Sequence, residues 1–196
     1  MTDYFRTIKK SFADVPIGEN DHIEVPPFLE ASEELIRLFD SMGASFGPVK
    51  SDLQGNVNKI RAKYLENPTK YNTLQNLVIA ERAEGKKTAT EGLLWLKRGL
   101  EFTATGLRRN LNDKNEELNV SFQRAYEQTL SQYHNFLVKP VFSLAMKACP
   151  YRKDFYAKLG SNTDEVYEAM LIWLGGLERD VAILNTFYTT NKYDKF

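Results

Sequence analysis

The sequence predicts an all-α protein of about eight helices, and three observations support this fold class. Apolar residues recur at spacings of three and four over most of the 196 residues, as they do along one face of an α-helix. Convincing β-hairpin signals are missing. The two β-like segments, NLVIA at 76–80 and FLVKPVF at 136–142, lie inside longer stretches with helical spacing. For this length we expect a single domain over residues 1–196 with a buried core.

Turn-forming residues divide the first part of the chain into four expected helices. The segments 43–48, 67–68 and 84–85 contain the glycine, proline and asparagine residues that commonly end one helix or start the next. The longest irregular connection is expected at 14–26. The helices expected in this part of the chain cover residues 2–13, 27–42, 48–65 and 69–83.

Four more helices are expected in the second part of the chain. Thr88-Ala-Thr-Glu91 has the spacing of a capping box, in which the two side chains bond to backbone N–H groups at a helix start. Pro140 cannot donate a backbone hydrogen bond, so we expect it to kink the sixth helix. Breaks are expected at 112–113, Pro150 and 160–162. The expected helices cover residues 89–109, 117–148, 151–159 and 163–190.

The composition excludes several classes of protein. Lys and Arg number 26 and so do Asp and Glu, which removes a general argument for binding nucleic acid or for a polybasic membrane tether. Cys149 is the single cysteine and there are two histidines, so we expect neither an internal disulfide nor a metal site. The N-terminus lacks the apolar core of a secretory signal, and no apolar run is long enough to span a membrane. We expect a cytoplasmic protein, with a monomer as the default state.

Signatures of catalysis are missing from the sequence. It contains no phosphate-binding glycine loop, no nucleophile elbow and no paired-histidine metalloprotease motif. Asp52 and His134 could orient and relay protons in a hydrolase, but no activated nucleophile can be identified beside them. We therefore expect a protein that is not an enzyme and needs no cofactor.

A polar stripe in the segment SDLQGNVNKI, residues 51–60, is the first candidate binding site. On a helix, Asp52, Asn56 and Lys59 fall within about 60° of one another. An apolar stripe about 100° further round the helix consists of Leu53, Val57 and Ile60. The polar stripe could be a solvated helix edge, or it could bind a small polar group at the rim of an apolar site.

The fifth expected helix carries a tryptophan on a face rich in glycine. Gly92, Gly99 and Gly106 share this face with Trp95 and Phe102, all within about 80° of arc. Each glycine inside a helix costs about 1 kcal/mol relative to alanine, so three of them near one indole need an explanation. They could allow close packing between helices, or they could leave the indole face open to a flat ligand such as a sugar ring.

The sixth expected helix places His134 on an apolar face. The residues that share this face are Leu130, Val138, Val141 and Ala145. Such a histidine can be a satisfied core residue, or its neutral imidazole can offer one donor and one acceptor to an amide ligand. Phe136 points about 160° away from His134 and is expected to be exposed.

The segment CPYRKDFYAKLG, residues 149–160, mixes aromatic and basic residues. The aromatic residues Tyr151, Phe155 and Tyr156 alternate with Arg152, Lys153 and Lys158. This mixture suits a membrane interface, where rings lie at headgroup level and cations meet anionic lipids, but it also fits a solvated helical turn. Phe136, Tyr151 and Lys153 are the candidate membrane contacts.

Seven segments taken together resemble the glycolipid transfer protein family. They are FLEA (28–31), FDSMG (39–43), PVKSDLQGNVNKI (48–60), TLQNL (73–77), LLWLKRGL (93–100), AYEQTLSQYH (125–134) and ACPYRKDF (148–155). TATEGLLWLKRGL and PYRKDFYAKLG in particular resemble the fungal heterokaryon-incompatibility members. The seven segments occur in order from residue 28 to residue 155, which is more specific than any single motif.

The resemblance implies a two-layer helical sandwich that encloses an apolar pocket for ceramide chains, with the sugar held at its mouth. It assigns head-group binding to Asp52, Asn56 and Lys59, and stacking on the first sugar ring to Trp95. His134 would bind the ceramide amide together with Asp52. Phe136 stands where animal members of the family carry a tryptophan that contacts the membrane.

The implied function is the non-vesicular carriage, or the sensing, of glycosphingolipids. A two-chain lipid rarely leaves its bilayer unaided, because each buried methylene holds it by about 0.8 kcal/mol, and a protein pocket would lower this barrier. Two alternatives stay open, a ceramide-1-phosphate carrier on the same fold and a helical interaction scaffold without a ligand. Arg98 keeps the ceramide-1-phosphate alternative open, because a phosphate group favours the forked guanidinium of arginine and Arg98 lies near Trp95. Since Lys59 is the single cation of the polar stripe, we expect a sugar head group.

Overall fold

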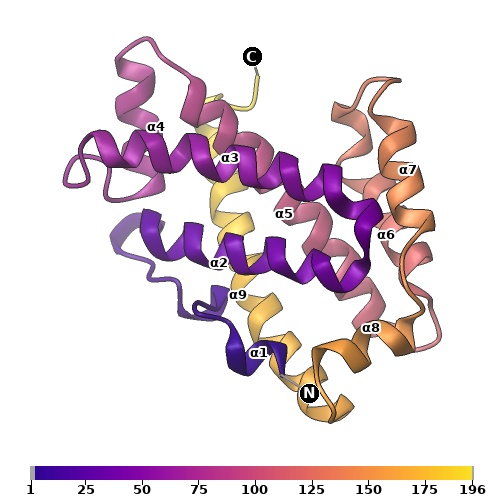
Figure 1. Cartoon of the computed structure of the whole chain (residues 1–196). Helices are drawn as coiled ribbons and strands as arrows, with labels where there is room; N and C mark the ends of the chain where they lie inside the picture. The colour runs from indigo at the N-terminus through magenta and orange to yellow at the C-terminus, as the bar shows by residue number, and fades with distance from the viewer. Residues whose placement is uncertain (1–2, 196) are drawn as a thin grey trace.

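The computed structural model describes residues 3–195, which form nine α-helices joined mostly by short turns (Figure 1). The helices are α1 (Tyr4–Thr7), α2 (Val25–Leu38), α3 (Gly47–Glu66), α4 (Leu74–Ala83), α5 (Thr88–Asn112), α6 (Leu118–Gln128), α7 (Lys139–Lys147), α8 (Arg152–Leu159) and α9 (Thr163–Asn191). Among these residues β-structure is limited to two isolated bridges, Ile17 with Ile23 and Glu24 with Thr73. The expected all-α class is confirmed.

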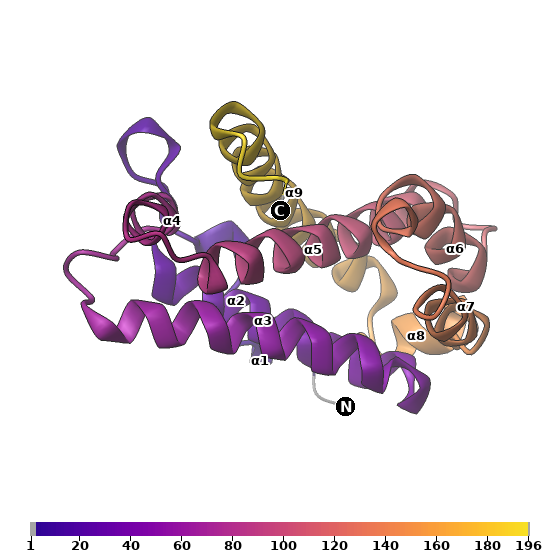
Figure 2. The ribbon, with the colours of Figure 1, turned by 90° about the horizontal axis from the view of Figure 1, so that it is seen from above.

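The helices are stacked in two layers. Seen from above, α1, α2, α3, α7 and α8 lie on one side of the molecule, and α4, α5, α6 and α9 lie on the other (Figure 2). The long helix α5 joins the layers, because it packs on α3 in one layer and on α6 and α9 in its own. This arrangement confirms the expected two-layer sandwich, and it brings the middle of α3 against the first half of α5.

Two of the glycines on the face of Trp95 are explained by close helix packing. A Cβ atom at Gly99 would lie 2.5 Å from Cδ2 of Leu53 in α3, and one at Gly106 would lie 2.9 Å from the Phe122 ring in α6. A side chain at either position would therefore have to displace the Leu53 or the Phe122 side chain from its present packing. Of the two interpretations of this face, packing is the correct one for Gly99 and Gly106.

Helix α9 packs on the N-terminal segment around the short 3₁₀ turn Phe12–Asp14. Arg179 donates to the carbonyl oxygens of Phe12 and Val15, at 3.1 Å each, and to Oδ1 of Asp180. The Asp180 carboxylate is fully buried, and its Oδ2 has no hydrogen-bond partner. Burial raises the pKa of Asp180 to about 6, although the neighbouring Arg179 opposes this shift.

The expected helix 2–13 is not continuous. Thr2, where it was expected to begin, lies outside the described residues, and α1 covers only Tyr4–Thr7. Ile8 and Ser11 have extended backbone angles, and the Ser11 side chain accepts a hydrogen bond from the Ala13 N–H to start the 3₁₀ turn. Serine favours such caps because its hydroxyl competes with helical backbone bonds.

The expected helix 117–148 is also wrong, since it is broken between Gln128 and Lys139. A short 3₁₀ turn, Ser131–Tyr133, and an extended His134 occupy the break. Asn135 Oδ1 then accepts hydrogen bonds from the N–H groups of Leu137, at 3.0 Å, and Val138, at 3.1 Å. Helix α7 begins directly after them. Pro140 does not kink a helix but lies in the first turn of α7, where its missing N–H is not needed.

The capping box expected at Thr88–Glu91 is absent, because Thr88 is already inside α5. The start of α5 is capped instead from α4, by the buried carboxylate of Glu81. This carboxylate accepts from the N–H groups of Ala89 and Thr90, at 2.9 and 2.7 Å, and from the Thr90 hydroxyl at 2.7 Å. By contrast, the expected helices 48–65, 151–159 and 163–190 agree with α3, α8 and α9 to within one residue at each end.

Candidate functional site

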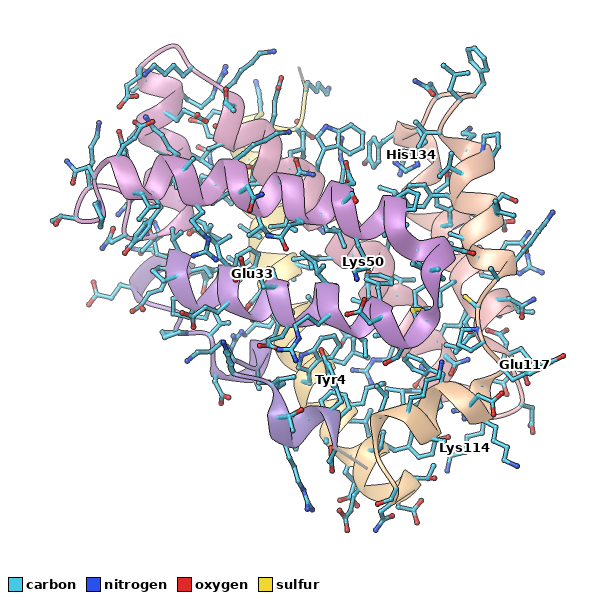
Figure 3. The ribbon with its side chains drawn as sticks, in the orientation of Figure 1. Tyr4, Glu33, Lys50, Lys114, Glu117 and His134 are labelled. Carbon is cyan, nitrogen blue, oxygen red and sulfur yellow. The ribbon has the colours of Figure 1, made fainter. Side chains whose placement is uncertain are left out.

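A pocket of about 570 Å³ lies between α3, α5 and the segment from Tyr133 to Phe142. All five residues expected to bind the head group line it, namely Asp52, Asn56 and Lys59 from α3, Trp95 from α5, and His134 from the loop before α7. Figure 3 shows His134 at the side of this loop that faces α3 and α5. The remaining wall is largely apolar and includes Leu137, Val138, Val141 and Phe142. The pocket therefore has a polar side on α3 and an apolar end at α7.

The polar side is a row of connected hydrogen bonds along α3. The Lys59 ammonium donates to Asn56 Oδ1 at 3.2 Å, and Asn56 Nδ2 donates to Asp52 Oδ2 at 3.5 Å. Asn56 is buried, whereas Asp52 and Lys59 remain exposed at its two sides. Loss of hydration raises the pKa of Asp52, and the nearby Lys59 partly offsets this effect. The row presents a carboxylate acceptor and an ammonium donor about two helical turns apart.

Two aromatic rings and an imidazole surround the middle of the pocket. The rings of Trp95 and His134 are nearly parallel, at 19°, with centroids 6.0 Å apart, and Tyr133 meets Trp95 edge-on at 6.4 Å. Tyr133, which the sequence did not single out, supplies a further wall to the pocket. A partly exposed indole between such walls offers a flat apolar surface for a ring.

Arg98 is occupied elsewhere. Its guanidinium carbon lies 3.6 Å from the Tyr133 ring centroid and 4.9 Å from that of Trp95, and Nη2 donates to the Asp194 carbonyl at 3.4 Å. Arg98 is buried, and it is not among the residues that line the pocket. The guanidinium therefore stacks on the outside of the aromatic wall, so Lys59 is the cation that reaches the polar row.

His134 was expected on a helix, but its backbone is extended, and tertiary contacts orient the ring. The Tyr126 hydroxyl is 3.0 Å from Nδ1, and the Phe142 ring centroid is 4.5 Å from that of the imidazole. Burial lowers the pKa of His134, and Lys139 lowers it further, so the ring is neutral at neutral pH. When Tyr126 donates to Nδ1, the proton of the imidazole lies on Nε2, which becomes a donor.

The third glycine of the α5 face belongs to this site. A Cβ atom at Gly92 would lie 3.2 Å from Cβ and 3.3 Å from Cδ of Lys59. The aliphatic stem of Lys59 therefore lies directly on the backbone of α5, at a position where no side chain intervenes. The spacing of the glycines drew attention to Gly92, but its contact with Lys59 could not be read from the sequence.

The candidate membrane contacts are all at the surface. Phe136 is 80% exposed, Tyr151 is 74% exposed, and Lys153 is exposed as well. The neighbouring residues Arg152, Phe155 and Tyr156, however, are buried, so these members of the aromatic and basic mixture at 149–160 are not available to a membrane. Arg152 donates to the Tyr167 hydroxyl and to the Asn110 carbonyl inside the protein. The sequence had not indicated the exposed apolar residues of the α7 region, which are Leu137, Val141 and Leu144.

Two structural features are missing from residues 3–195. None of the helices in this range is both long enough and apolar enough to cross a bilayer. Within the same range, no three His, Cys, Asp or Glu side chains gather in a group that could hold a metal ion.

The sequence is similar to one family profile and to several known proteins. A family profile described as glycolipid transfer protein (GLTP) matches residues 23–161. The sequence is 52% identical over 190 residues to a glycolipid transfer protein from Aureobasidium melanogenum, covering 96% of this chain and 94% of that protein. It is 34% identical over 199 residues to human pleckstrin homology domain-containing family A member 8, covering 94% of this chain but only 38% of that longer protein.

Solved structures show the same relationship. HET-C2, a fungal glycolipid transfer protein, superposes with a TM-score of 0.94 at 48% identity, covering 98% of this chain and 100% of its own. The GLTP-fold structure of FAPP2 gives a TM-score of 0.90 at 33% identity over 98% and 97% of the two chains. Human ceramide-1-phosphate transfer protein, at 16% identity, a TM-score of 0.84 and 94% and 95% coverage, shares the fold alone. The chain therefore belongs to the glycolipid transfer protein family.

Proposed function

We propose that this chain is a cytoplasmic, non-vesicular carrier or sensor of glycosphingolipids, with residues 1–196 acting as one lipid-binding domain. The observation that carries the proposal is the pocket in which a polar row, an indole face and an imidazole lie opposite an apolar end. A relative that covers nearly the whole chain is named a glycolipid transfer protein, and FAPP2 is described as selecting simple glycosphingolipids.

Each polar group has a distinct role toward the lipid. The Asp52 carboxylate accepts from the ceramide amide N–H, and the Nε2–H of His134 donates to the amide carbonyl. The Lys59 ammonium donates to sugar oxygens, while the first sugar ring lies on Trp95. Asn56 is buried and bonded to both Asp52 and Lys59, so its main task is to hold these two groups in place.

The hydrocarbon chains enter the protein at the apolar end of the pocket, beside Val138, Val141 and Phe142. Below this end lies an aromatic cluster in which the rings of Phe142 and Tyr126 stack at 5.4 Å. Apolar surroundings replace those of the bilayer, so the cost of about 0.8 kcal/mol for each methylene exposed to water is avoided during transfer.

The membrane is contacted through the α7 region. Leu137 and Val141 belong both to the pocket wall and to the exposed apolar surface, which also contains Phe136 and Leu144. Lys139 and Lys147 are exposed cations on α7 itself, and Lys153 is an exposed cation in the first turn of α8. Because the surface and the pocket share residues, a lipid can pass from the bilayer to the pocket along apolar side chains.

Vesicle transfer assays test the function. We expect faster transfer of galactosyl- or glucosylceramide than of ceramide-1-phosphate, because one lysine beside Asp52 is a poor site for a phosphate group of about −1.5 to −2 charges.

Asp52→Val, which removes the amide acceptor, should lose most transfer while keeping the helical content of the wild type. Trp95→Ala should do the same, and Trp95→Phe should retain part of the activity. A preference for the phosphate lipid would contradict the proposed head group, and full activity of Asp52→Val would contradict the site.

A further inference from the structure

We infer that Tyr126 is a positioning residue of the lipid site, which fixes both the orientation and the tautomer of the His134 imidazole. This inference rests on the proposed function, in which His134 donates a hydrogen bond to the amide carbonyl of the ceramide. Tyr126 is not among the residues that line the pocket. It acts on the lipid through the 3.0 Å hydrogen bond between its hydroxyl and Nδ1 of His134.

The backbone around His134 does not orient the side chain. His134 lies between α6 and α7 with extended backbone angles, so no helical neighbours restrict its ring. A half-turn about χ2 exchanges the places of the ring nitrogen and carbon atoms, and both positions are compatible with the two-fold preference of this torsion. The two nitrogens point in nearly opposite directions. A bond that holds Nδ1 against Tyr126 therefore leaves Nε2 as the nitrogen for a ligand.

Tyr126 is itself held in place by contacts with three helices. It belongs to α6, and its ring stacks on Phe142 of α7 at an interplanar angle of 15°, with centroids 5.4 Å apart. The same ring meets Phe102 of α5 edge-on at 6.1 Å. Tyr126 is only 6% exposed. Its hydroxyl is therefore a fixed point, and Tyr126→Phe keeps the ring contacts while it removes the hydrogen bond.

The surroundings of the Tyr126 hydroxyl set the direction of this hydrogen bond. Burial raises the pKa of Tyr126, so the phenol keeps its proton. Among residues 3–195, Nδ1 of His134 is the one group to which this hydroxyl is hydrogen-bonded. If Nδ1 were the donor, the buried phenol proton would have no partner, which is unfavourable. The phenol therefore donates, and the imidazole proton lies on Nε2.

The tautomer with its proton on Nε2 is the one that complements an amide. An amide presents one donor, its N–H group, and one acceptor, its carbonyl oxygen, whereas an ionised carboxylate such as that of Asp52 can only accept. An unprotonated Nε2 would face the amide with a second acceptor and leave the carbonyl without a donor. By holding the proton on Nε2, Tyr126 makes Asp52 and His134 a matched pair of one acceptor and one donor.

Nitrogen-15 NMR of the lipid-free protein measures the tautomer directly. His22 and His134 are the two histidines of the sequence, so a His22→Gln variant assigns the signals. At pH 7.5, where His134 is neutral because burial lowers its pKa, we expect the chemical shift of a protonated nitrogen for Nε2 and of an unprotonated one for Nδ1. In Tyr126→Phe the two shifts should move toward one another, because both tautomers become populated.

Titration calorimetry with short-chain glucosylceramide measures the effect on binding. We expect Tyr126→Phe to weaken binding about fivefold, as for one hydrogen bond that is no longer aligned. In a His134→Ala background the same substitution should change the affinity less than twofold, because Tyr126 acts through the imidazole. Tyr156→Phe is a matched control, since it removes a buried hydroxyl bonded to Asn110 Oδ1 at 3.1 Å, outside the pocket. It should alter neither the affinity nor the His134 signals.

Three results would overturn the inference while leaving the carrier function intact. They are a wild-type imidazole with its proton on Nδ1, an unchanged glucosylceramide affinity in Tyr126→Phe, and a fivefold loss that persists in the His134→Ala background. The last result would show that Tyr126 acts by packing and not through His134. A wild-type protein that does not bind glucosylceramide would instead contradict the proposed function, and the NMR signals distinguish this case because they are recorded without lipid.

Discussion

Replacing Gly92 with alanine tests whether the backbone of α5 positions Lys59, the lysine that we propose to bind the head group. The added methyl carbon would lie 3.2 Å from Cβ and 3.3 Å from Cδ of Lys59, and 3.4 Å from the Asn56 carbonyl oxygen. Carbon atoms make their best contacts at about 3.5–4.0 Å, so the stem of Lys59 has to move by a few tenths of an ångström. The Lys59 ammonium now lies 3.2 Å from Asn56 Oδ1. Because a donor–acceptor distance of about 3.6 Å is too long for a hydrogen bond, a movement of this size can break the bond.

The expected loss of affinity follows from the hydrogen bond to the sugar that we propose for Lys59. Hydrogen bonds to charged groups contribute about 1.5–3 kcal/mol, but Lys59 is exposed and flexible, so the lower end applies. We expect glucosylceramide to bind about tenfold more weakly, which corresponds to about 1.4 kcal/mol. Stability should not fall, because alanine improves the helix by up to about 1 kcal/mol while the clash is relieved at a flexible side chain. Affinity and melting temperature should therefore not fall together.

A double-mutant cycle with Lys59→Ala separates positioning of the lysine from any other effect of the methyl group. If Gly92 acts through Lys59, Gly92→Ala should cause no further loss of glucosylceramide affinity in the Lys59→Ala background. Gly175→Ala, which meets nothing within 4 Å, is the control for a glycine replacement in a helix. The same tenfold loss in both backgrounds, or no loss in the wild-type background, would refute the reasoning.

Three further predictions concern the membrane surface, a buried acid and a helix cap. Phe136→Ala and Leu144→Ala should slow transfer between vesicles without weakening the binding of soluble short-chain glycolipid. Ile172→Ala on α9 is the control, because Ile172 is 67% exposed and Leu144 is 66% exposed, and this variant should leave transfer unchanged. Since the pKa of Asp180 is raised to about 6 on folding, its ionisation opposes folding increasingly as the pH rises from about 4 to above 6. Chemical denaturation of Asp180→Asn should show a gain of about 1–3 kcal/mol over wild type at pH 7.5 that disappears near pH 4, and a gain at both pH values would contradict the linkage. Glu81→Gln keeps one acceptor oxygen but turns an amide donor toward the N–H group of either Ala89 or Thr90, so the free energy of unfolding should fall by about 1–3 kcal/mol, and an unchanged value would show that the cap contributes nothing.

The polar row could be predicted from the sequence because it is local. Asp52, Asn56 and Lys59 are on one helix, and the period of 3.6 residues alone brings them to one side of it. The structure adds the hydrogen bonds between them and the burial of Asn56. The two-layer arrangement came from the family resemblance and not from periodicity, since helical patterns do not determine which helices pack together.

His134 shows where the sequence pattern misleads. The apolar spacing from Leu130 to Ala145 fits one helical face and predicts a single helix with a kink at Pro140. Asn135 and Pro140 together are instead a start signal for α7, because the side chain of Asn135 bonds to nearby N–H groups and proline is favoured in a first turn. The imidazole still reaches the pocket, but through contacts with Tyr126 and Phe142 that no local pattern encodes.

Contacts between distant segments account for the other differences. The cap that Glu81 provides to α5 joins two helices across a turn, and a capping-box motif at Thr88 gave no hint of it. Gly92, Gly99 and Gly106 look equivalent in the sequence, yet one faces Lys59, one faces Leu53 and one faces Phe122. Only the packing of α3 and α6 on α5 gives each glycine its separate role.

The distribution of charge in the pocket also fits a carrier that must release its lipid. The two charged groups, Asp52 and Lys59, stay exposed, and the uncharged Asn56 is the buried member of the row. Exposed charges bond to water before the lipid arrives, so each bond to the head group replaces one to water and contributes about 1 kcal/mol, or somewhat more where a charge is involved. Burial of the chains in the protein likewise replaces their burial in the bilayer. Since both exchanges are close to balanced, the polar row selects among head groups without holding the lipid so tightly that its return to a membrane becomes slow.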